Sequence, residues 1–175
     1  MLAGHLTVPV HHPDFLALEV ASVLLGSGPG LTGRIPQRLR EREGLAYAAS
    51  AAAAAGAGSQ AGRLVVHAGT GPRRVEAAVA AIREEIERFV GDGIAWRELE
   101  EARSYLLGSD PFRRETARQL AVLQAQALLF GVPVDDAAWL VERLEELDVA
   151  SLEAAVRRHV HPDRLLVTLG LPAGA

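Results

Sequence analysis

The chain has 175 residues, 49% of them hydrophobic and 23% charged, which is typical of one globular domain over residues 1–175. Its formal net charge of −4 argues against nucleic-acid binding, and the absence of cysteine excludes disulfides and thiolate metal sites. Since no apolar run approaches the ~20 residues that span a bilayer and no signal peptide opens the chain, we expect no membrane partner and a cytoplasmic location, unless a leader precedes it in a longer protein.

The chain begins with a predicted strand and a predicted helix. Apolar residues alternate with other residues over positions 4–10, which indicates a half-buried strand. Pro9 cannot donate a ladder hydrogen bond, so the strand lies at an edge or Pro9 falls in its last residues. Asp14 is a suitable N-cap for the next helix, which Gly26 ends.

A glycine-rich loop over positions 26–33 comes next. Thr32 can cap the helix that follows over positions 35–42, and Pro36 lies early enough to be tolerated in a first turn. Gly44 supplies the left-handed residue that ends such a helix, and the chain then continues as a strand.

This turn brings Arg40, in the last helical turn, close to Tyr47, which lies just past the corner on the strand. Both side chains donate hydrogen bonds, so the pair could hold a carbonyl or an oxyanion, but it is poorly suited to act alone as a nucleophile or a base. A purely structural explanation also fits. Arginine near a helix C-terminus complements the helix dipole, and tyrosine at the start of a strand is ordinary packing.

The rest of the chain predicts a hairpin, a run of helices and a last strand. The alanine-rich positions 48–58 favour a helix by propensity, but their place before a turn and a clear strand at 63–68 indicates a hairpin. Apolar periodicity and Gly/Pro breaks predict helices at 72–90, 95–107, 112–130, 135–147 and 151–160, and a strand at 164–171. This order predicts an α+β two-layer domain, with a mostly antiparallel sheet and helices packed on one face.

Positions 28–47 resemble the glycine loop and the Leu-Arg-Glu…Gly-Leu-Ala-Tyr run of the pitrilysin/insulinase/mitochondrial processing peptidase family. Leu39-Arg40-Glu41 and Gly44-Leu45-Ala46-Tyr47 match this run, and Arg34-Ile35 stands where the family usually has Arg-Leu. Thr32-Gly33 departs from the two serines that are common there. Weaker similarity includes positions 98–102 after Gly93 and positions 162–165. The chain is similar to the second, zinc-free half of these proteins.

The resemblance implies the non-catalytic half of a zinc metalloendopeptidase with the same α+β architecture. A zinc-bearing peptidase half, on the same longer chain or as a separate subunit, would supply the zinc, the general base and the sheet edge that takes up a peptide substrate. Arg40 and Tyr47 would donate to the substrate carbonyl as it gains negative charge. The loop with Gly28, Gly30 and Gly33 would form a rim of the substrate chamber, or it is a plain connector.

A different class of function stays open, because zinc-free family members also serve as structural core or dimerisation subunits. In that case Arg40 and Tyr47 are relics of a site, and the chain would hold a complex together or form a homodimer.

We expect no metal and no cofactor in this chain itself. None of the six histidines carries the family's inverted H-x-x-E-H motif. His159 and His161 come nearest to a metal pair, but His161 precedes Pro162 outside the helix and no third ligand suggests itself. Acidic clusters at 84–87, 98–101 and 145–148 could attract a basic peptide, or could belong to solvated helix faces with arginines three or four positions away.

Overall fold

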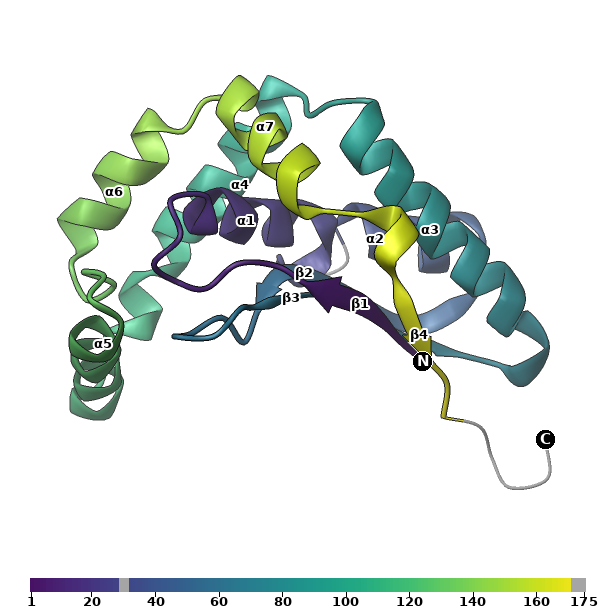
Figure 1. Cartoon of the computed structure of the whole chain (residues 1–175), viewed down its shortest axis with the longest axis horizontal. Coiled ribbons are helices and arrows are strands. Elements are labelled where there is room, and N and C mark those ends of the chain that lie inside the picture. Colours follow the sequence, from purple (N-terminus) through teal and green to yellow (C-terminus); the bar gives the residue numbers. More distant parts are fainter. Residues whose placement is uncertain (29–31, 171–175) are drawn as a thin grey trace.

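The computed structural model describes residues 1–28 and 32–170, and it confirms the predicted α+β class. Figure 1 shows a four-stranded sheet with helices gathered over one of its faces. The strands lie in the order β2-β3-β1-β4, and each neighbouring pair is antiparallel. The elements are β1 (Leu2–Leu6), α1 (Phe15–Ser22), α2 (Arg34–Pro36), β2 (Ala46–Ala55), β3 (Arg63–Thr70), α3 (Val75–Gly91), α4 (Trp96–Ser109), α5 (Ala117–Phe130), α6 (Ala137–Glu146), α7 (Val149–His159) and β4 (Leu166–Thr168).

The two faces of the sheet differ in burial because alternate side chains point to opposite sides. Ala3 pairs with Val66, which pairs with Ala51, and all three are buried under the helices. On the opposite face Leu6 is 71% exposed and Leu166 is 75% exposed. The helices therefore cover one face, and the other face is open in this chain (Figure 1).

The helical layer packs on the sheet through α1 and α3. Helix α1 lies against β2 and α7, and its Leu18 and Val20 are fully buried. In α3 the predicted apolar stripe is buried at Ile82, Ile86 and Phe89. Each fully buried side chain of this size contributes roughly 1.5–3 kcal/mol.

The glycine-rich segment contains a close backbone crossing. A Cβ atom on Gly33 would lie 2.3 Å from the Gly26 Cα, and Gly26 has φ +153°. Helix α2 starts directly after this crossing and continues as wider turns through Gln37–Arg42, with Pro36 in its first turn as predicted. Only a residue without a Cβ fits on each side of the contact.

Two arginines fix α2 against the helical layer. The Arg34 guanidinium donates to both carboxylate oxygens of Glu98 in α4, at 2.9 and 2.8 Å. The Arg38 side chain, 10% exposed, donates to Glu43 at 2.8 Å and to Glu84 in α3 at 2.5 Å. Although partial burial opposes ionisation of Glu98, the Arg34 guanidinium and the Ala95 N–H hold the pKa of that carboxyl below its usual range.

Three predictions about the first half of the chain need correction. The first strand is Leu2–Leu6 rather than positions 4–10, and it is an interior strand, so Pro9 lies beyond it. Asp14 makes no side-chain capping bond to α1, because its carboxylate contacts α7 instead. Gly33 rather than Thr32 occupies the N-cap position of α2.

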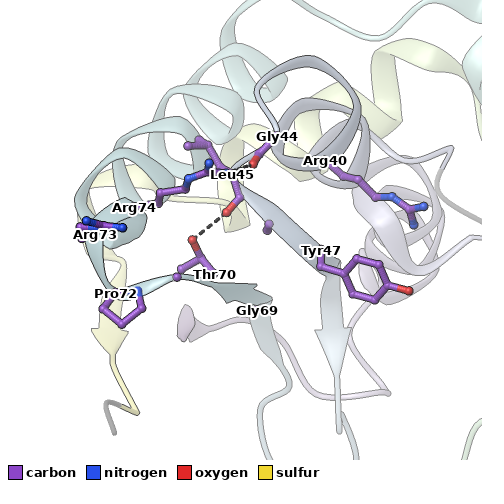
Figure 2. A pocket seen from close by; sticks show the side chains of 11 residues that line it. Arg40, Gly44, Leu45, Tyr47, Gly69, Thr70, Pro72, Arg73 and Arg74 are labelled. Atoms are coloured by element: carbon purple, nitrogen blue, oxygen red, sulfur yellow. Dashed lines mark hydrogen bonds between the residues drawn. The ribbon is translucent and has the colours of Figure 1, made fainter. Parts of the chain in front are cut away.

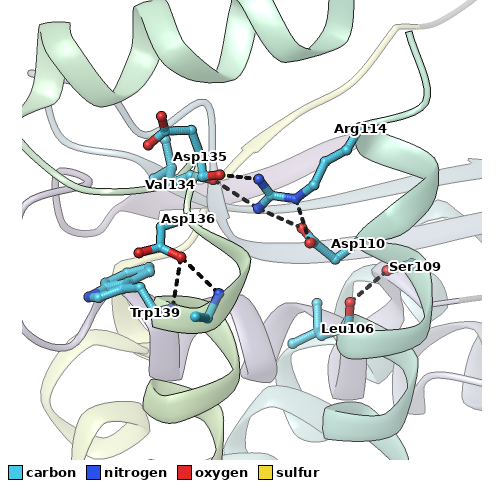
Figure 3. Close-up of polar contacts among 9 residues, drawn as sticks. Leu106, Ser109, Asp110, Arg114, Val134, Asp135, Asp136 and Trp139 are labelled. Atoms are coloured by element: carbon cyan, nitrogen blue, oxygen red, sulfur yellow. Dashed lines mark hydrogen bonds and ion pairs between the residues drawn. The ribbon is translucent and has the colours of Figure 1, made fainter.

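The helix predicted over 112–130 is also shorter than expected. Pro111–Arg113 forms a single tight turn, and α5 begins only at Ala117, after a capping box between Thr116 and Gln119. The Arg114 side chain holds this break in place, as Figure 3 shows. It donates to both oxygens of the buried Asp110, at 2.6 and 3.1 Å, and to the Asp135 carbonyl.

The last elements differ from the predictions by a few residues. Helix α7 begins at Val149, two residues before the predicted start, because Asp148 caps it. The final strand is Leu166–Thr168, shorter than the predicted 164–171, whose last position lies outside the described residues. Among the helices of residues 1–28 and 32–170, none is long and apolar enough to cross a membrane.

Candidate functional site

The corner between α2 and β2 forms as the sequence predicts. Gly44 has φ +59°, the left-handed conformation that ends a helix. The Leu45 N–H then donates to the Leu39 carbonyl at 2.7 Å, and the Glu43 N–H donates to the Arg38 carbonyl at 3.1 Å. These bonds satisfy carbonyls of the last helical turn and direct the chain into β2.

The structure brings the two predicted site residues together. The Arg40 guanidinium carbon lies 5.6 Å from the centre of the Tyr47 ring, within the range of a cation–π contact. Tyr47 is 86% exposed, and Arg40 has an ion pair with its neighbour Glu41 at 3.3 Å. Figure 2 shows the two side chains next to each other and projecting from the corner. Both polar ends are therefore accessible to a ligand.

Arg40 and Tyr47 border an open groove of about 640 Å³ between the α2–β2 corner and the turn after β3. The Thr70 hydroxyl donates to the Leu45 carbonyl at 2.7 Å, and an Arg74 N–H donates to the Gly44 carbonyl at 2.5 Å, so the two walls are joined. The lining residues are Arg40, Gly44, Leu45, Ala46, Tyr47, Gly69, Thr70, Gly71, Pro72, Arg73 and Arg74.

Charge in this groove has one sign. Three of the described residues that line it are arginines, and none of them is acidic. Guanidinium, phenol and hydroxyl groups donate hydrogen bonds to carbonyl and carboxylate oxygens. The groove therefore suits binding and polarisation of an oxygen.

Sequence reasoning found Arg40 and Tyr47 but missed Arg73 and Arg74. These two follow Gly71-Pro72, a plain turn, and nothing in their spacing connects them to Arg40. The sheet register makes the connection, since Ala46 at the start of β2 pairs with Thr70 at the end of β3.

The three glycines predicted for the chamber rim have different surroundings. Gly33 is buried against Gly26, where the close crossing by itself accounts for a glycine. Gly28 is half-buried, and a Cβ there would meet the Val23 side chain at 3.2 Å. Gly30 lies outside the described residues. A role of this loop at a substrate chamber stays a prediction.

The two histidines that came nearest to a metal pair face different partners. His161 donates its backbone N–H to His5 Nε2 at 3.0 Å. His159 Nε2 lies 2.7 Å from the Asp14 carboxylate. Neither arrangement has the helical i, i+4 histidine spacing of an H-x-x-E-H site, so these residues do not fit the catalytic zinc of the resembled family.

Comparison with known sequences decides the family. A model of the family described as "Peptidase M16 inactive domain" matches residues 3–106, which is more than half of the chain. The chain belongs to this family. The resemblance to the pitrilysin family is thereby confirmed.

Relatives of this M16 inactive domain include a curated protein and solved structures. The curated "Non-peptidase homolog YmxG" of Helicobacter pylori is 24% identical over 151 residues, which are 83% of this chain and 33% of that protein. The peptidase M16 inactive domain from Pseudomonas fluorescens matches with a TM-score of 0.80 and 22% identity, over 94% of this chain and 38% of the other. A putative zinc protease from Bordetella pertussis matches with a TM-score of 0.77 and 18% identity, over 94% and 88% of the two chains.

The chain spans about a third of the length of the curated relative that it matches. The similarity to the solved structures shows the fold of the M16 inactive domain. Within that fold, the Arg34–Glu98 ion pair joins two segments that are 64 residues apart in the sequence, and it holds the helical segment that leads to Arg40 against α4.

Proposed function

We propose that this M16 inactive domain forms the non-catalytic wall of a peptidase chamber and uses Arg40 and Tyr47 to bind the substrate carbonyl. The observation that carries the proposal is the contact of these two exposed donors at the border of a groove with three arginines. Donors aimed at an oxygen that gains charge in the transition state accelerate acyl transfer. Zinc and the general base belong to the partner half.

The surface of the chain supports pairing with a second half. Large apolar side chains are exposed along α5, with Leu128 87% and Leu129 70% exposed, and on the open sheet face at Leu6 and Leu166. Exposed apolar patches of this kind mark interaction sites. The partner we propose is an M16 half that carries H-x-x-E-H, either on the same longer chain or as a separate subunit.

The test is turnover of the reconstituted enzyme with a fluorogenic peptide. Arg40→Ala or Tyr47→Phe is expected to lower turnover by roughly 10²–10³, because one oxyanion donor contributes about 3–4 kcal/mol. Zinc content, measured by elemental analysis, stays at the wild-type level. Tyr105→Phe, in α4 and not among the residues that line the groove, is the matched control and keeps wild-type turnover.

Wild-type turnover in both variants would show that the Arg40–Tyr47 pair is structural. An equal loss of turnover in Tyr105→Phe would show that removal of any tyrosine hydroxyl disturbs the assembly. The assignment of Arg40 and Tyr47 as substrate-binding residues would then have no support.

A second candidate function is a catalytically dead structural subunit, which the name "Non-peptidase homolog" of the Helicobacter pylori relative favours. This candidate predicts a stable complex, or a homodimer, without peptidase activity. Size-exclusion chromatography together with the peptide assay on the assembled complex separates the two. A complex that forms at micromolar concentration and cleaves nothing supports the scaffold.

A further inference from the structure

Three potential metal ligands meet between the turn before α1 and the end of α7. The side chains are His12 and Asp14 from the turn and His159 from the last helical residue, and one ligand atom of each lies within 4.8 Å of the others. His159 Nε2 is 2.7 Å from Asp14 Oδ2, and His12 Nδ1 is 3.9 Å from the same oxygen. The rings of His12 and His159 contact edge to face, with centroids 5.0 Å apart.

We propose that His12, Asp14 and His159 form a binding site for a divalent transition-metal ion of the Zn²⁺ class. Two imidazoles and one carboxylate are the ligand types that Zn²⁺ prefers, and a water molecule can complete a tetrahedral shell. The bound ion connects the beginning of α1 to the end of α7, two segments that are 145 residues apart. The three ligands are not among the residues that line the Arg40 groove, so the site does not depend on the proposed peptidase role.

The spacing of the ligand atoms is close to what such an ion needs. Tetrahedral bonds of about 2.0–2.1 Å place neighbouring ligand atoms about 3.3 Å apart. The two contacts to Asp14 Oδ2 lie on either side of this value, at 2.7 and 3.9 Å, so each has to change by less than about 1 Å. The side chains are already held in place, since Asp14 is 13%, His159 19% and His12 33% exposed.

Three existing interactions compete with the metal. The first is the 2.7 Å hydrogen bond between His159 Nε2 and Asp14 Oδ2, which an ion bound to these two atoms replaces. The Asp14 N–H donates to His12 Nδ1 at 3.0 Å, so an ion at that nitrogen replaces this hydrogen bond. An Arg158 N–H donates to Asp14 Oδ1 at 3.2 Å, but this guanidinium is 59% exposed and can move into solvent. Coordination also requires both imidazoles to be unprotonated at the binding nitrogen, so affinity falls as the pH is lowered.

The test is calorimetric titration of the whole chain with ZnCl₂ in a non-chelating buffer at pH 7.5. We expect one equivalent to bind with a dissociation constant below about 10 µM, weaker than the four-ligand sites of zinc fingers. A hundredfold excess of Zn²⁺ over that constant should raise the melting temperature by about 5–10 °C.

Variants separate ligation from the hydrogen bonds already present. His159→Gln keeps a donor for Asp14, and His12→Asn keeps an acceptor for the Asp14 N–H, but neither retains the imidazole. Each should weaken binding at least about tenfold. His11→Gln, at an exposed histidine in the same turn, is the matched control and should bind like the wild type. Arg158→Gln should bind more tightly, because it frees Asp14 and removes a positive charge.

Three results would overturn the site. The first is the absence of both binding heat and a melting-temperature shift at 100 µM ZnCl₂. The second is Zn²⁺ binding that persists in both His12→Asn and His159→Gln. The third is a loss of Zn²⁺ affinity in His11→Gln as large as the loss in those two variants. The last result would assign the ion to adventitious surface histidines.

Discussion

Ser22 joins α1 to β2 through a single buried hydroxyl. Its Oγ accepts the Ala53 N–H at 2.8 Å and donates to the Leu18 carbonyl at 2.8 Å. The pairing of β2 with β3 shifts register between Ala52 and Ala55, so the Ala53 N–H turns to Ser22 instead of a strand neighbour. Both Ser22 and Ala53 are buried. Replacement of Ser22 by alanine therefore leaves a buried donor without its partner.

The magnitude follows from three contributions. A buried N–H without a partner costs about 1–3 kcal/mol of stability. The Leu18 carbonyl is an i−4 acceptor within the helix, so loss of its second bond adds little. Alanine in a helix is better than serine by about 0.5 kcal/mol, which acts in the opposite direction. Ser104→Ala, at an exposed position of α4, gains only this propensity and is the matched control.

We expect Ser22→Ala to be about 2 kcal/mol less stable than Ser104→Ala, which is a difference of roughly 4–8 °C in melting temperature for a chain of this size. Urea unfolding followed by circular dichroism measures the free energy, and hydrogen exchange should show faster exchange at the Ala53 amide. A difference below about 0.5 kcal/mol would refute the reasoning, because the hydroxyl would then be replaceable by water or by repacking.

Three further predictions concern ion pairs and protonation. The pKa of Glu98 is lowered in the folded chain, so its bond to Arg34 stabilises the fold above the unfolded-state pKa, and this stabilisation is lost as the pH falls through the folded-state pKa. Glu98→Gln should therefore make the free energy of unfolding depend less on pH below about pH 4.5. Burial lowers the pKa of His5, although its bond to the Leu6 carbonyl opposes this shift. The free energy of unfolding should therefore decline as the pH falls below about 6.5, because the unfolded chain then binds a proton that the folded chain does not. His5→Gln should remove this decline when urea unfolding is measured at several pH values. Arg114→Met leaves the Asp110 carboxylate buried without its partner and should cost about 3 kcal/mol in thermal unfolding, most of which Asp110→Asn in the same chain should restore. An Arg114→Met variant as stable as wild type would contradict the last of these.

The sequence predicted the corner of the site because its signals are local. Gly44 ends a helix whose apolar residues Ile35 and Leu39 are four apart, and both are fully buried. The position of Tyr47 then follows from the few residues after the turn. The alanine tract was also predicted correctly as a strand, against its helix propensity, because its flanking turn and the next strand outweighed local preference.

The features that the sequence did not predict depend on distant contacts. Asp14 reads as a helix cap, but the fold brings the end of α7 to its carboxylate, so the capping bond is absent. The contact of His159 with His12 is not visible in the sequence, because His12 lies 147 positions earlier. Arg73 and Arg74 join the groove through the β2–β3 register. In each case a tertiary contact overrides or adds to a local signal.

The helical turns from Arg34 to Arg42 carry two arginines in long-range ion pairs, Arg34 and Arg38, and one, Arg40, for which we propose a role in substrate binding. Arg34 and Arg38 bind acidic residues 64 and 46 positions away, and both side chains are at least 80% buried. Arg40 pairs with its own neighbour, whose side chain is 59% exposed, and such a pair contributes only about 0–1 kcal/mol. Arg40 can therefore exchange this carboxylate for a substrate oxygen at little energetic cost, while the other two arginines keep its helix in place. It follows that Arg40→Ala should leave the melting temperature nearly unchanged and Arg34→Ala should lower it, so a loss of turnover in the first variant reports on the groove and not on folding.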